Sequence, residues 1–276
     1  MPKGHEHPSH SPASARGLTL PVRLPARIGP VTSPNSRRAI RWEIGLVLAI
    51  TFGVSGLRSL LRLIEALASP QPLNAQHITL NQQQSDLTWL DPAFQLISTG
   101  VLFAWGGLAL FLLWRHLPPE GGVHTPARNP CLPGAALAAV IGIPGLAFYI
   151  AAVHLGLSKQ VAPSGLGDTP WRLPLLVLNA WANGFAEEVI VIGWLGTRLR
   201  QLRTPWPWIF AASCLLRGSY HLYQGVSAGA GNIVMGAVYL YYWKRTGRVW
   251  PLVIAHGLID TLAFTGYAFL GDTPGL

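Results

Sequence analysis

Seven long apolar runs dominate this sequence and restrict what it can fold into. They lie near residues 42–66, 92–114, 133–157, 173–196, 206–222, 228–243 and 250–270. Most approach the roughly 20 residues that a helix needs to cross the hydrocarbon core of a bilayer. Only 11% of the residues are charged, whereas a typical soluble domain has about 25%. Because a backbone in lipid must satisfy its own hydrogen bonds, the runs predict an all-α, polytopic membrane protein with about seven transmembrane helices.

The first 41 residues differ in composition from the rest. They are rich in Pro, Ser, Arg and His and contain few apolar residues, which is typical of a segment that cannot bury a core. We therefore predict a disordered basic cytoplasmic tail over 1–41 and a transmembrane helical domain over 42–276. The ionisable residues described below place the functional core in the last four helices, at about 173–270.

The basic residues predict the orientation of the chain. The net charge is +9, but the basic residues form no single patch, so no nucleic-acid partner is expected. They are numerous in the tail and in alternate loops, and Arg198, Arg200 and Arg203 are assigned to one such loop. Cytoplasmic loops carry an excess of Lys and Arg. This predicts a multi-pass protein of the cell membrane with its N-terminus in the cytoplasm and its C-terminus outside.

Ionisable side chains interrupt three of the apolar runs. Each costs about 2.5–3.5 kcal/mol on insertion scales, so such residues are functional hypotheses by default. The candidates are Glu187 and Glu188 in the fourth run, Arg217 and His221 in the fifth, and His256 and Asp260 in the seventh. Asn183 precedes Glu187 by four residues and shares its helix face. Three polar faces that cannot stably meet lipid predict one interior site.

These residue types suit direct attack of water on an amide. A carboxylate in apolar surroundings readily takes a proton, a neighbouring His can help to activate water, and a second His can donate to the forming oxyanion. No Ser or Cys is well placed as a nucleophile. Zinc is the alternative, since Glu and His are zinc ligands. However, the HExxH spacing is absent, so we expect no metal cofactor.

The motifs also resemble a known family. An acidic pair in "EEVIVIG", then "RGSYH" and "HGLID", all between about 173 and 260, are similar to the CPBP group of CAAX prenyl endopeptidases and bacteriocin-processing (Abi) proteins. The resemblance implies an α-helical membrane fold and a metal-free, glutamate-dependent endopeptidase. It implies that Glu187 with His221 activates water, and that His256 with Asp260 supports the oxyanion.

The sequence departs from the family pattern at three positions. Ile192 stands where the family usually has Arg, and Arg217 stands where Phe is frequent. We interpret this as a guanidinium that has moved to another helix, so that Arg217 pairs with Glu188. Asp260 stands where Asn is frequent, and an ionised carboxylate cannot donate a hydrogen bond. Asp260 is therefore either protonated or limited to orienting His256.

We therefore expect an intramembrane glutamate-dependent endopeptidase that cleaves a membrane-associated peptide or protein, in CAAX-type or bacteriocin-type processing. The alternatives are a non-catalytic immunity or scaffold protein of the same fold, a metal-dependent version of the peptidase, and a proton relay or transporter. The expected partners are the substrate and the lipid bilayer. The sequence predicts no oligomeric state.

Overall fold

The structure is a computed structural model that describes residues 29–114 and 129–270. Its elements, in chain order, are α1 (Pro34–Ile50), α2 (Phe52–Ala68), the 3-10 turn η1 (Leu73–Ala75), β1 (His77–Asn81), α3 (Leu90–Trp114), α4 (Cys131–His154), β2 (Gln160–Ser164), α5 (Arg172–Glu187), the π-helix η2 (Glu188–Trp194), α6 (Leu195–Gln201), α7 (Trp206–Ser219), the 3-10 turn η3 (Leu222–Gln224), α8 (Val226–Thr246) and α9 (Trp250–Leu270). Every predicted apolar run is helical. The all-α prediction is thus confirmed, with one small β-ribbon added.

The number of membrane spans is smaller than predicted. Among the described residues, three helices are long and apolar enough to cross a membrane: Leu90–Trp114, Cys131–His154 and Arg172–Gln201. A fourth is reached if α1 and α2, which meet at an angle of 47°, form one broken span. The 14 residues of α7 extend only about 21 Å at 1.5 Å per residue, short of a core about 30 Å thick. Several long apolar helices make this a multi-pass membrane protein, but seven spans are not shown.

The boundary predicted for the N-terminal tail is wrong where the structure describes it. Residues 1–28 lie outside the described residues, whereas α1 already begins at Pro34, inside the segment 1–41. Proline is favoured in the first turn of a helix, because its missing N–H has no intrahelical partner there. Of the arginines on α1, Arg38 and Arg41 are exposed and Arg37 is half-buried. The helix therefore begins further towards the N-terminus than the composition indicated.

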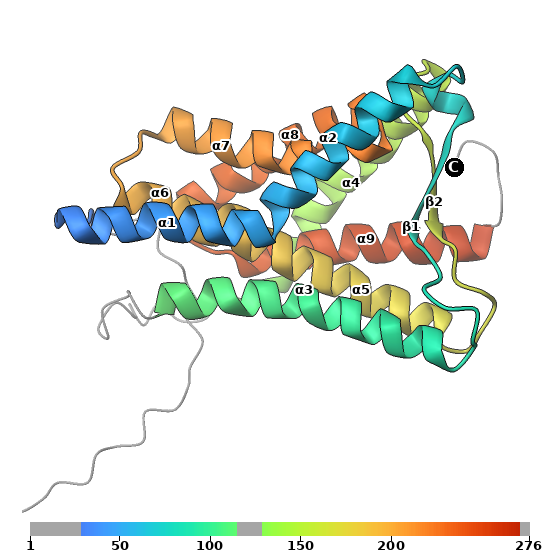
Figure 1. Cartoon of the computed structure of the whole chain (residues 1–276), viewed down its shortest axis with the longest axis horizontal. Coiled ribbons are helices and arrows are strands. Elements are labelled where there is room, and N and C mark those ends of the chain that lie inside the picture. The colour runs from blue at the N-terminus through green and yellow to red at the C-terminus, as the bar shows by residue number, and fades with distance from the viewer. Residues whose placement is uncertain (1–28, 115–128, 271–276) are drawn as a thin grey trace, which may run out of the picture.

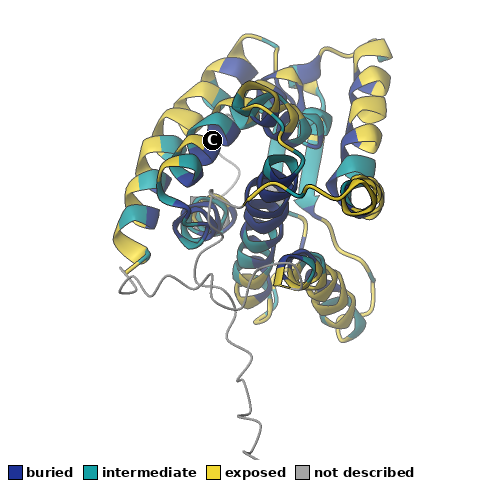
Figure 2. Cartoon of the chain, turned by 90° about the vertical axis from the view of Figure 1, so that its left-hand side faces the viewer, coloured by how far each residue is buried: buried dark blue, intermediate teal, exposed yellow. Residues whose placement is uncertain are grey.

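The helices surround one buried stretch of chain. α5 packs against α9 and α3, while α7 packs against α8 and α2 (Figure 1). Buried residues concentrate in the central helices, and the outer helices present exposed side chains (Figure 2). Many of those exposed side chains on α2 and α3 are large and apolar, as expected for surfaces in contact with lipid acyl chains.

A glycine contact brings α5 and α9 close together. A Cβ atom on Gly184 would lie only 2.9 Å from the backbone nitrogen of Gly257. Small residues let helix backbones approach closely in membranes. Since Gly184 lies just before the acidic pair and Gly257 just after His256, this close approach places those side chains opposite one another.

The fourth apolar run is not one regular helix. A π-helix separates α5 from α6, and all of its residues are buried. A π-helix has i→i+5 hydrogen bonds, and such segments are frequent at functional sites. The hydroxyl of Ser213 on α7 donates to the carbonyl oxygen of Val191 at 2.9 Å. The irregular segment is thereby fastened to its neighbour at mid-length.

The β-ribbon consists of two parallel strands that are far apart in sequence. His77 pairs with Gln160 and Asn81 with Ser164. β1 joins the end of α2 to the start of α3, so it runs across the gap between the diverging ends of these helices (Figure 1). β2 follows α4 and contacts α9. The sequence predicts no strand in either connecting segment.

Candidate active site

The predicted ionisable residues converge on one buried place. Glu187 ends α5 and Glu188 begins the π-helix, and their exposed fractions are 6% and 0%. Arg217 lies in the last turn of α7 and His256 in α9, and both are also buried. Charged side chains are almost never buried without partners. Their contacts therefore define what this cluster can do.

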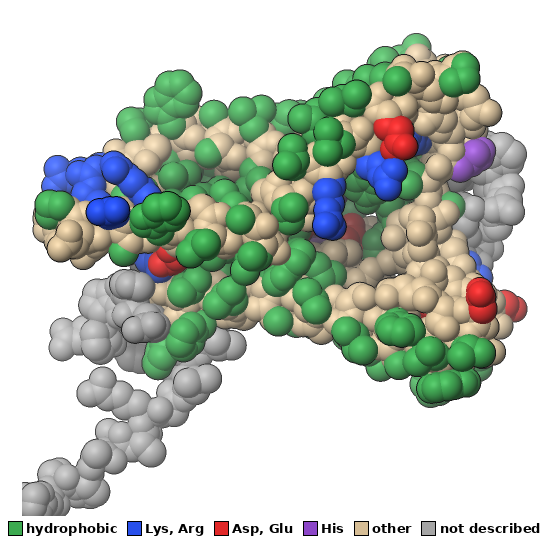
Figure 3. Space-filling view, viewed as in Figure 1, with side chains coloured by type: hydrophobic (Ala, Val, Ile, Leu, Met, Phe, Trp, Pro, Cys, Tyr) green, Lys and Arg blue, Asp and Glu red, His purple; other side chains and the backbone are tan. Residues whose placement is uncertain are grey.

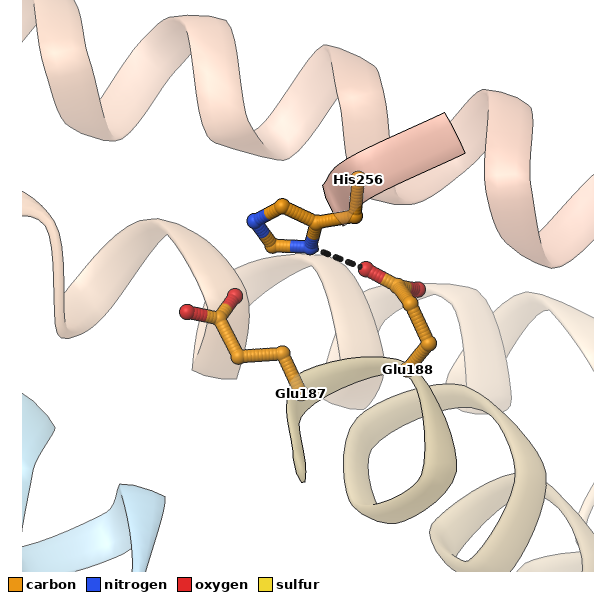
Figure 4. Close-up of side chains that lie close together, drawn as sticks. All are labelled: Glu187, Glu188 and His256. Atoms are coloured by element: carbon orange, nitrogen blue, oxygen red, sulfur yellow. Dashed lines mark hydrogen bonds and ion pairs between the residues drawn. The ribbon is translucent and has the colours of Figure 1, made fainter. Parts of the chain in front are cut away.

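One carboxylate oxygen of Glu188 accepts hydrogen bonds from both Arg217 and His256. Its Oε1 lies 2.5 Å from Nη2 of Arg217 and 2.7 Å from Nδ1 of His256. Figure 4 shows the imidazole of His256 directed at this carboxylate. The ion pair that we expected between Arg217 and Glu188 is present. A buried carboxylate needs such compensation, because desolvation of an unpaired charge costs several kcal/mol.

Glu187 has a different set of neighbours. Its Oε2 accepts a hydrogen bond of 2.7 Å from the hydroxyl of Tyr220. The same oxygen lies 3.6 Å from Nη1 of Arg217 and 3.7 Å from Nε2 of His221. In Figure 4 the carboxylate of Glu187 stands apart from the bond between Glu188 and His256. The two adjacent acids are thus held by different partners and are available for different tasks.

Tyr220 is a site residue that the sequence reasoning missed. In a continuous helix its side chain would point about 100° away from that of His221. However, α7 ends at Ser219, so both residues lie beyond the regular helix and both approach Glu187. The ring of Tyr220 packs on Phe52, with 4.7 Å between centroids. In the sequence, the one signal for a role of Tyr220 is its position directly before His221 in "RGSYH".

His256 is oriented by a residue other than the one expected. Its Nε2 lies 3.6 Å from Oδ2 of Asp260, which is too long for a hydrogen bond. Instead, Nδ1 of His256 is hydrogen-bonded to Oε1 of Glu188, which accepts. The close approach of α5 and α9 explains the difference, since it puts Glu188 directly against the imidazole. Asp260 remains within ion-pair distance on the next turn of α9.

Asn183 lies at the margin of the cluster. It is half-buried, and its side chain makes no hydrogen bond within the described part of the chain. One turn earlier, the side chain of Asn179 donates to the side chain of Asn81 at the end of β1. The polar face that the sequence predicted on α5 therefore extends from the β-ribbon to Glu187.

Several polar atoms of the cluster have unused hydrogen-bonding capacity. Within the described residues, no hydrogen-bond partner is found for Oε2 of Glu188, Nε and Nη1 of Arg217, or either ring nitrogen of His221, although all are buried. Most buried polar atoms in proteins have a partner. This arrangement can therefore bind water or polar groups of a substrate.

Among the described residues, Glu187, Glu188 and His256 form a group that could hold a metal ion. One ligand atom from each lies within 4.8 Å of the others. Their contacts fit a metal ion poorly, because Oε1 of Glu188 already receives the Arg217 guanidinium and the His256 imidazole. A guanidinium at 2.5 Å supplies the positive charge that a bound cation would bring.

Comparison with known proteins agrees with this arrangement. Residues 169–262 match the family model described as type II CAAX prenyl endopeptidase Rce1-like. No significant match was found to a curated protein or to a solved structure. The matched segment contains all the residues of the buried cluster. Residues 169–262 are therefore similar to the Rce1-like family of type II CAAX prenyl endopeptidases, which are peptidases.

Proposed function

We propose that this protein is an intramembrane endopeptidase in which Glu187 activates the water that attacks a peptide bond. The observation that carries the proposal is the gap of 3.7 Å between Oε2 of Glu187 and Nε2 of His221. The gap is too long for a direct hydrogen bond, but one water molecule can bridge it. Both ring nitrogens of His221 are without another partner in the described residues, which supports a water at this place.

In this mechanism, water adds to the carbonyl carbon of the substrate and its proton passes to the carboxylate of Glu187. The tetrahedral intermediate then collapses, and the proton goes to the leaving amine. The hydroxyl of Tyr220 holds Glu187 at 2.7 Å and so limits where its oxygen can lie. General acid–base catalysis of this kind contributes about 10²–10⁴-fold to a rate.

The second half of the cluster serves the negative charge that forms on the substrate. Glu188 fixes His256 through Nδ1, which directs Nε2 to the other side of the ring. With both ring nitrogens protonated, His256 can donate from Nε2 to the oxyanion, and Asp260 lies 3.6 Å from the same nitrogen. Arg217 compensates the charge of Glu188 and lies between the two acids, within 3.6 Å of both.

The substrate that we propose is a membrane-associated peptide or protein. The family description names CAAX prenyl endopeptidases, so a prenylated C-terminal peptide is the first candidate and a bacteriocin-type precursor is the second. Two alternatives keep the same fold: a metal-dependent peptidase that uses the ligand set of Glu187, Glu188 and His256, and a non-catalytic immunity or scaffold protein.

The placement in the membrane is part of the proposal. We propose that the broken span of α1 and α2, together with α7, α8 and α9, completes the membrane domain beside the three long apolar helices, so that seven spans put the N-terminus in the cytoplasm and the C-terminus outside. Arg200, Arg203, Lys244 and Arg245 support this orientation as loop or helix-end cations. A reporter fused to the C-terminus tests it, and a cytoplasmic signal contradicts an odd number of spans.

The test of the activity is cleavage of membrane-tethered peptides by the purified protein in liposomes. The panel contains a farnesylated peptide ending in Cys-aliphatic-aliphatic-X and the same peptide anchored by an acyl chain. Glu187→Gln should reduce cleavage by about 10²–10⁴-fold, while Glu65→Gln, at an exposed acid of α2, should leave it unchanged. Activity that a chelator abolishes and zinc restores would favour the metal-dependent alternative. No cleavage by wild type would favour the non-catalytic one.

A further inference from the structure

An opening on one face of the molecule is framed by α2, α3 and β1. α2 and α3 are in contact near one end, where the rings of Phe52 and Trp105 meet edge to face at 5.8 Å. From there the two helices diverge, and β1 connects their far ends (Figure 1). Figure 3 shows that this face is hollowed between the three elements, with an acidic side chain visible in its depth. The third side of the opening is therefore a strand.

The β-ribbon is fixed to the candidate active site at both ends. At one end, the backbone N–H of Lys159 donates to the carbonyl oxygen of Gln224 at 2.9 Å, and Ser158 pairs with Gly225 in an antiparallel bridge. Gln224 lies only three residues after His221. At the other end, Asn81 accepts from Asn179 of α5. The strand therefore has a defined position relative to both His221 and Glu187.

The two outer edges of the ribbon differ. On β2, the N–H of Val161 donates to the hydroxyl of Tyr149 at 2.9 Å, and Pro163 has no N–H. That edge offers few backbone donors. Directly before β1, the carbonyl of Gln76 accepts from Gln160 and so faces β2.

Successive residues of a strand direct their backbone groups to alternate sides. His77 and Thr79 therefore direct theirs away from β2. Apart from the ladder between β1 and β2, neither residue makes a backbone-to-backbone hydrogen bond in the described part of the chain.

We propose that the outer edge of β1, at His77 and Thr79, binds an extended segment of the peptide substrate as an additional strand. This rests on the function proposed above and names how its substrate is held. A peptidase of this family must bind a peptide, and an unpaired strand edge binds one through backbone hydrogen bonds with little dependence on sequence. α2, which borders the opening, carries two exposed arginines, Arg58 and Arg62.

The test is a backbone N-methyl scan of the farnesylated peptide. Each derivative carries one N-methyl group, and cleavage by the wild-type protein in liposomes is measured. A peptide paired with β1 should lose about tenfold in kcat/KM at alternate residues, since each lost backbone hydrogen bond is worth on the order of 1 kcal/mol and the methyl group adds a clash. Derivatives methylated at the intervening residues should be cleaved normally. Uniform effects, or none, would overturn the proposal.

Two protein variants sharpen the result. Thr79→Pro removes the outward N–H, whereas Thr79→Val keeps the backbone and the side-chain shape. The proline variant should cleave the unmodified peptide about tenfold more slowly and lose the difference between alternate N-methylated derivatives, while the valine variant, which keeps the N–H, should retain that difference. If Thr79→Pro does not fold, as judged by its unfolding temperature, the scan on the wild-type protein still decides.

A binding measurement separates this proposal from the catalytic one. Glu187→Gln protein is photo-crosslinked to the farnesylated peptide carrying a diazirine residue beside the scissile bond, and the labelled site is mapped. Labelling within residues 76–80 supports docking on β1, even if no cleavage is ever seen. Labelling confined to other segments overturns the docking proposal, even if the peptide is cleaved. Absence of cleavage by wild type counts only against the endopeptidase assignment.

Discussion

Two buried arginines lie near opposite ends of the π-helix, and they are held in different ways. Arg198, on α6, has all of its guanidinium nitrogens engaged: with both carboxylate oxygens of Glu43, with Oε1 of Gln201 and with the carbonyl of Leu112. The indole of Trp194 donates to the same carboxylate at 2.9 Å. This cluster connects α1, α3 and α6 and is saturated.

Arg217 presents the contrasting case. Only its Nη2 forms a hydrogen bond, to Glu188, while Nε and Nη1 have no hydrogen-bond partner in the described residues. Both arginines are completely buried, so burial alone does not separate them. A saturated buried network fixes a structure, whereas an incompletely satisfied one keeps capacity for a ligand. The difference suggests that Arg198 fastens helices and that Arg217 belongs to a reaction site.

The largest expected effect is on stability, at Arg198. Arg198→Met leaves the carboxylate of Glu43 with a single donor, Trp194, and should destabilise the fold by about 3–5 kcal/mol. Thermal unfolding in detergent measures this, and the double variant with Glu43→Leu should recover part of the loss. Cleavage per folded molecule should stay within about twofold of wild type, since Arg198 lies outside the candidate active site. A collapse of activity in protein that remains folded would show that the two clusters act as one.

The next effect is on activity, at Arg217. Arg217→Ala removes a charge-assisted hydrogen bond to Glu188, and cleavage should fall by about 10–150-fold, as expected for 1.5–3 kcal/mol. Arg217→Lys should keep a fraction of the activity because it keeps the charge but loses the planar donor geometry. Rates are compared at a temperature where all variants are folded. A folded Arg217→Ala protein with full activity would show that Arg217, like Arg198, has only a structural role.

A smaller effect is expected at Tyr220. Tyr220→Phe removes only the hydroxyl that holds Glu187, so kcat should fall by about tenfold while KM stays the same, as expected for the loss of one hydrogen bond to a charged group. The packing of the ring on Phe52 is retained, so the unfolding temperature should change little. An increase in KM at constant kcat would instead indicate contact with the substrate.

The smallest effect is expected between the two clusters. Ser213→Ala removes the hydrogen bond to the carbonyl of Val191 and should cost about 0.5–1.5 kcal/mol of stability. Activity should be unchanged if the π-helix is held mainly by its surrounding packing. A loss of activity comparable to that of Tyr220→Phe would show that the position of Glu188 depends on this one bond.

The sequence was informative where one physical constraint acted alone. Ionisable groups cannot stably face lipid, so the polar faces around Glu187, His221 and His256 had to converge, and they do. Apolar runs of sufficient length had to be helical, and they are. The pairing of Arg217 with Glu188 followed from the need to compensate a buried charge.

The parts that the sequence did not reveal depend on contacts between distant segments. Arg198 was assigned to a basic loop, but it lies buried at the end of the fourth run because Glu43, 155 residues away, reaches it. Tyr220 enters the site only because α7 stops one residue earlier. The β-ribbon pairs segments on either side of α3 and α4. Local periodicity carries no information about such partners.

The π-helix Glu188–Trp194 also determines how far Arg198 is rotated about the helix axis relative to the acidic pair. Each π turn contains one residue more than an α turn, so the segment changes the angle at which α6 leaves α5. With a purely α-helical connection, the acidic pair and Arg198 would not both face their present partners. The π-helix therefore sets the orientation of the Arg198 cluster relative to the candidate active site. Insertion or deletion of one residue in this segment would change that orientation without altering the side chains of either cluster.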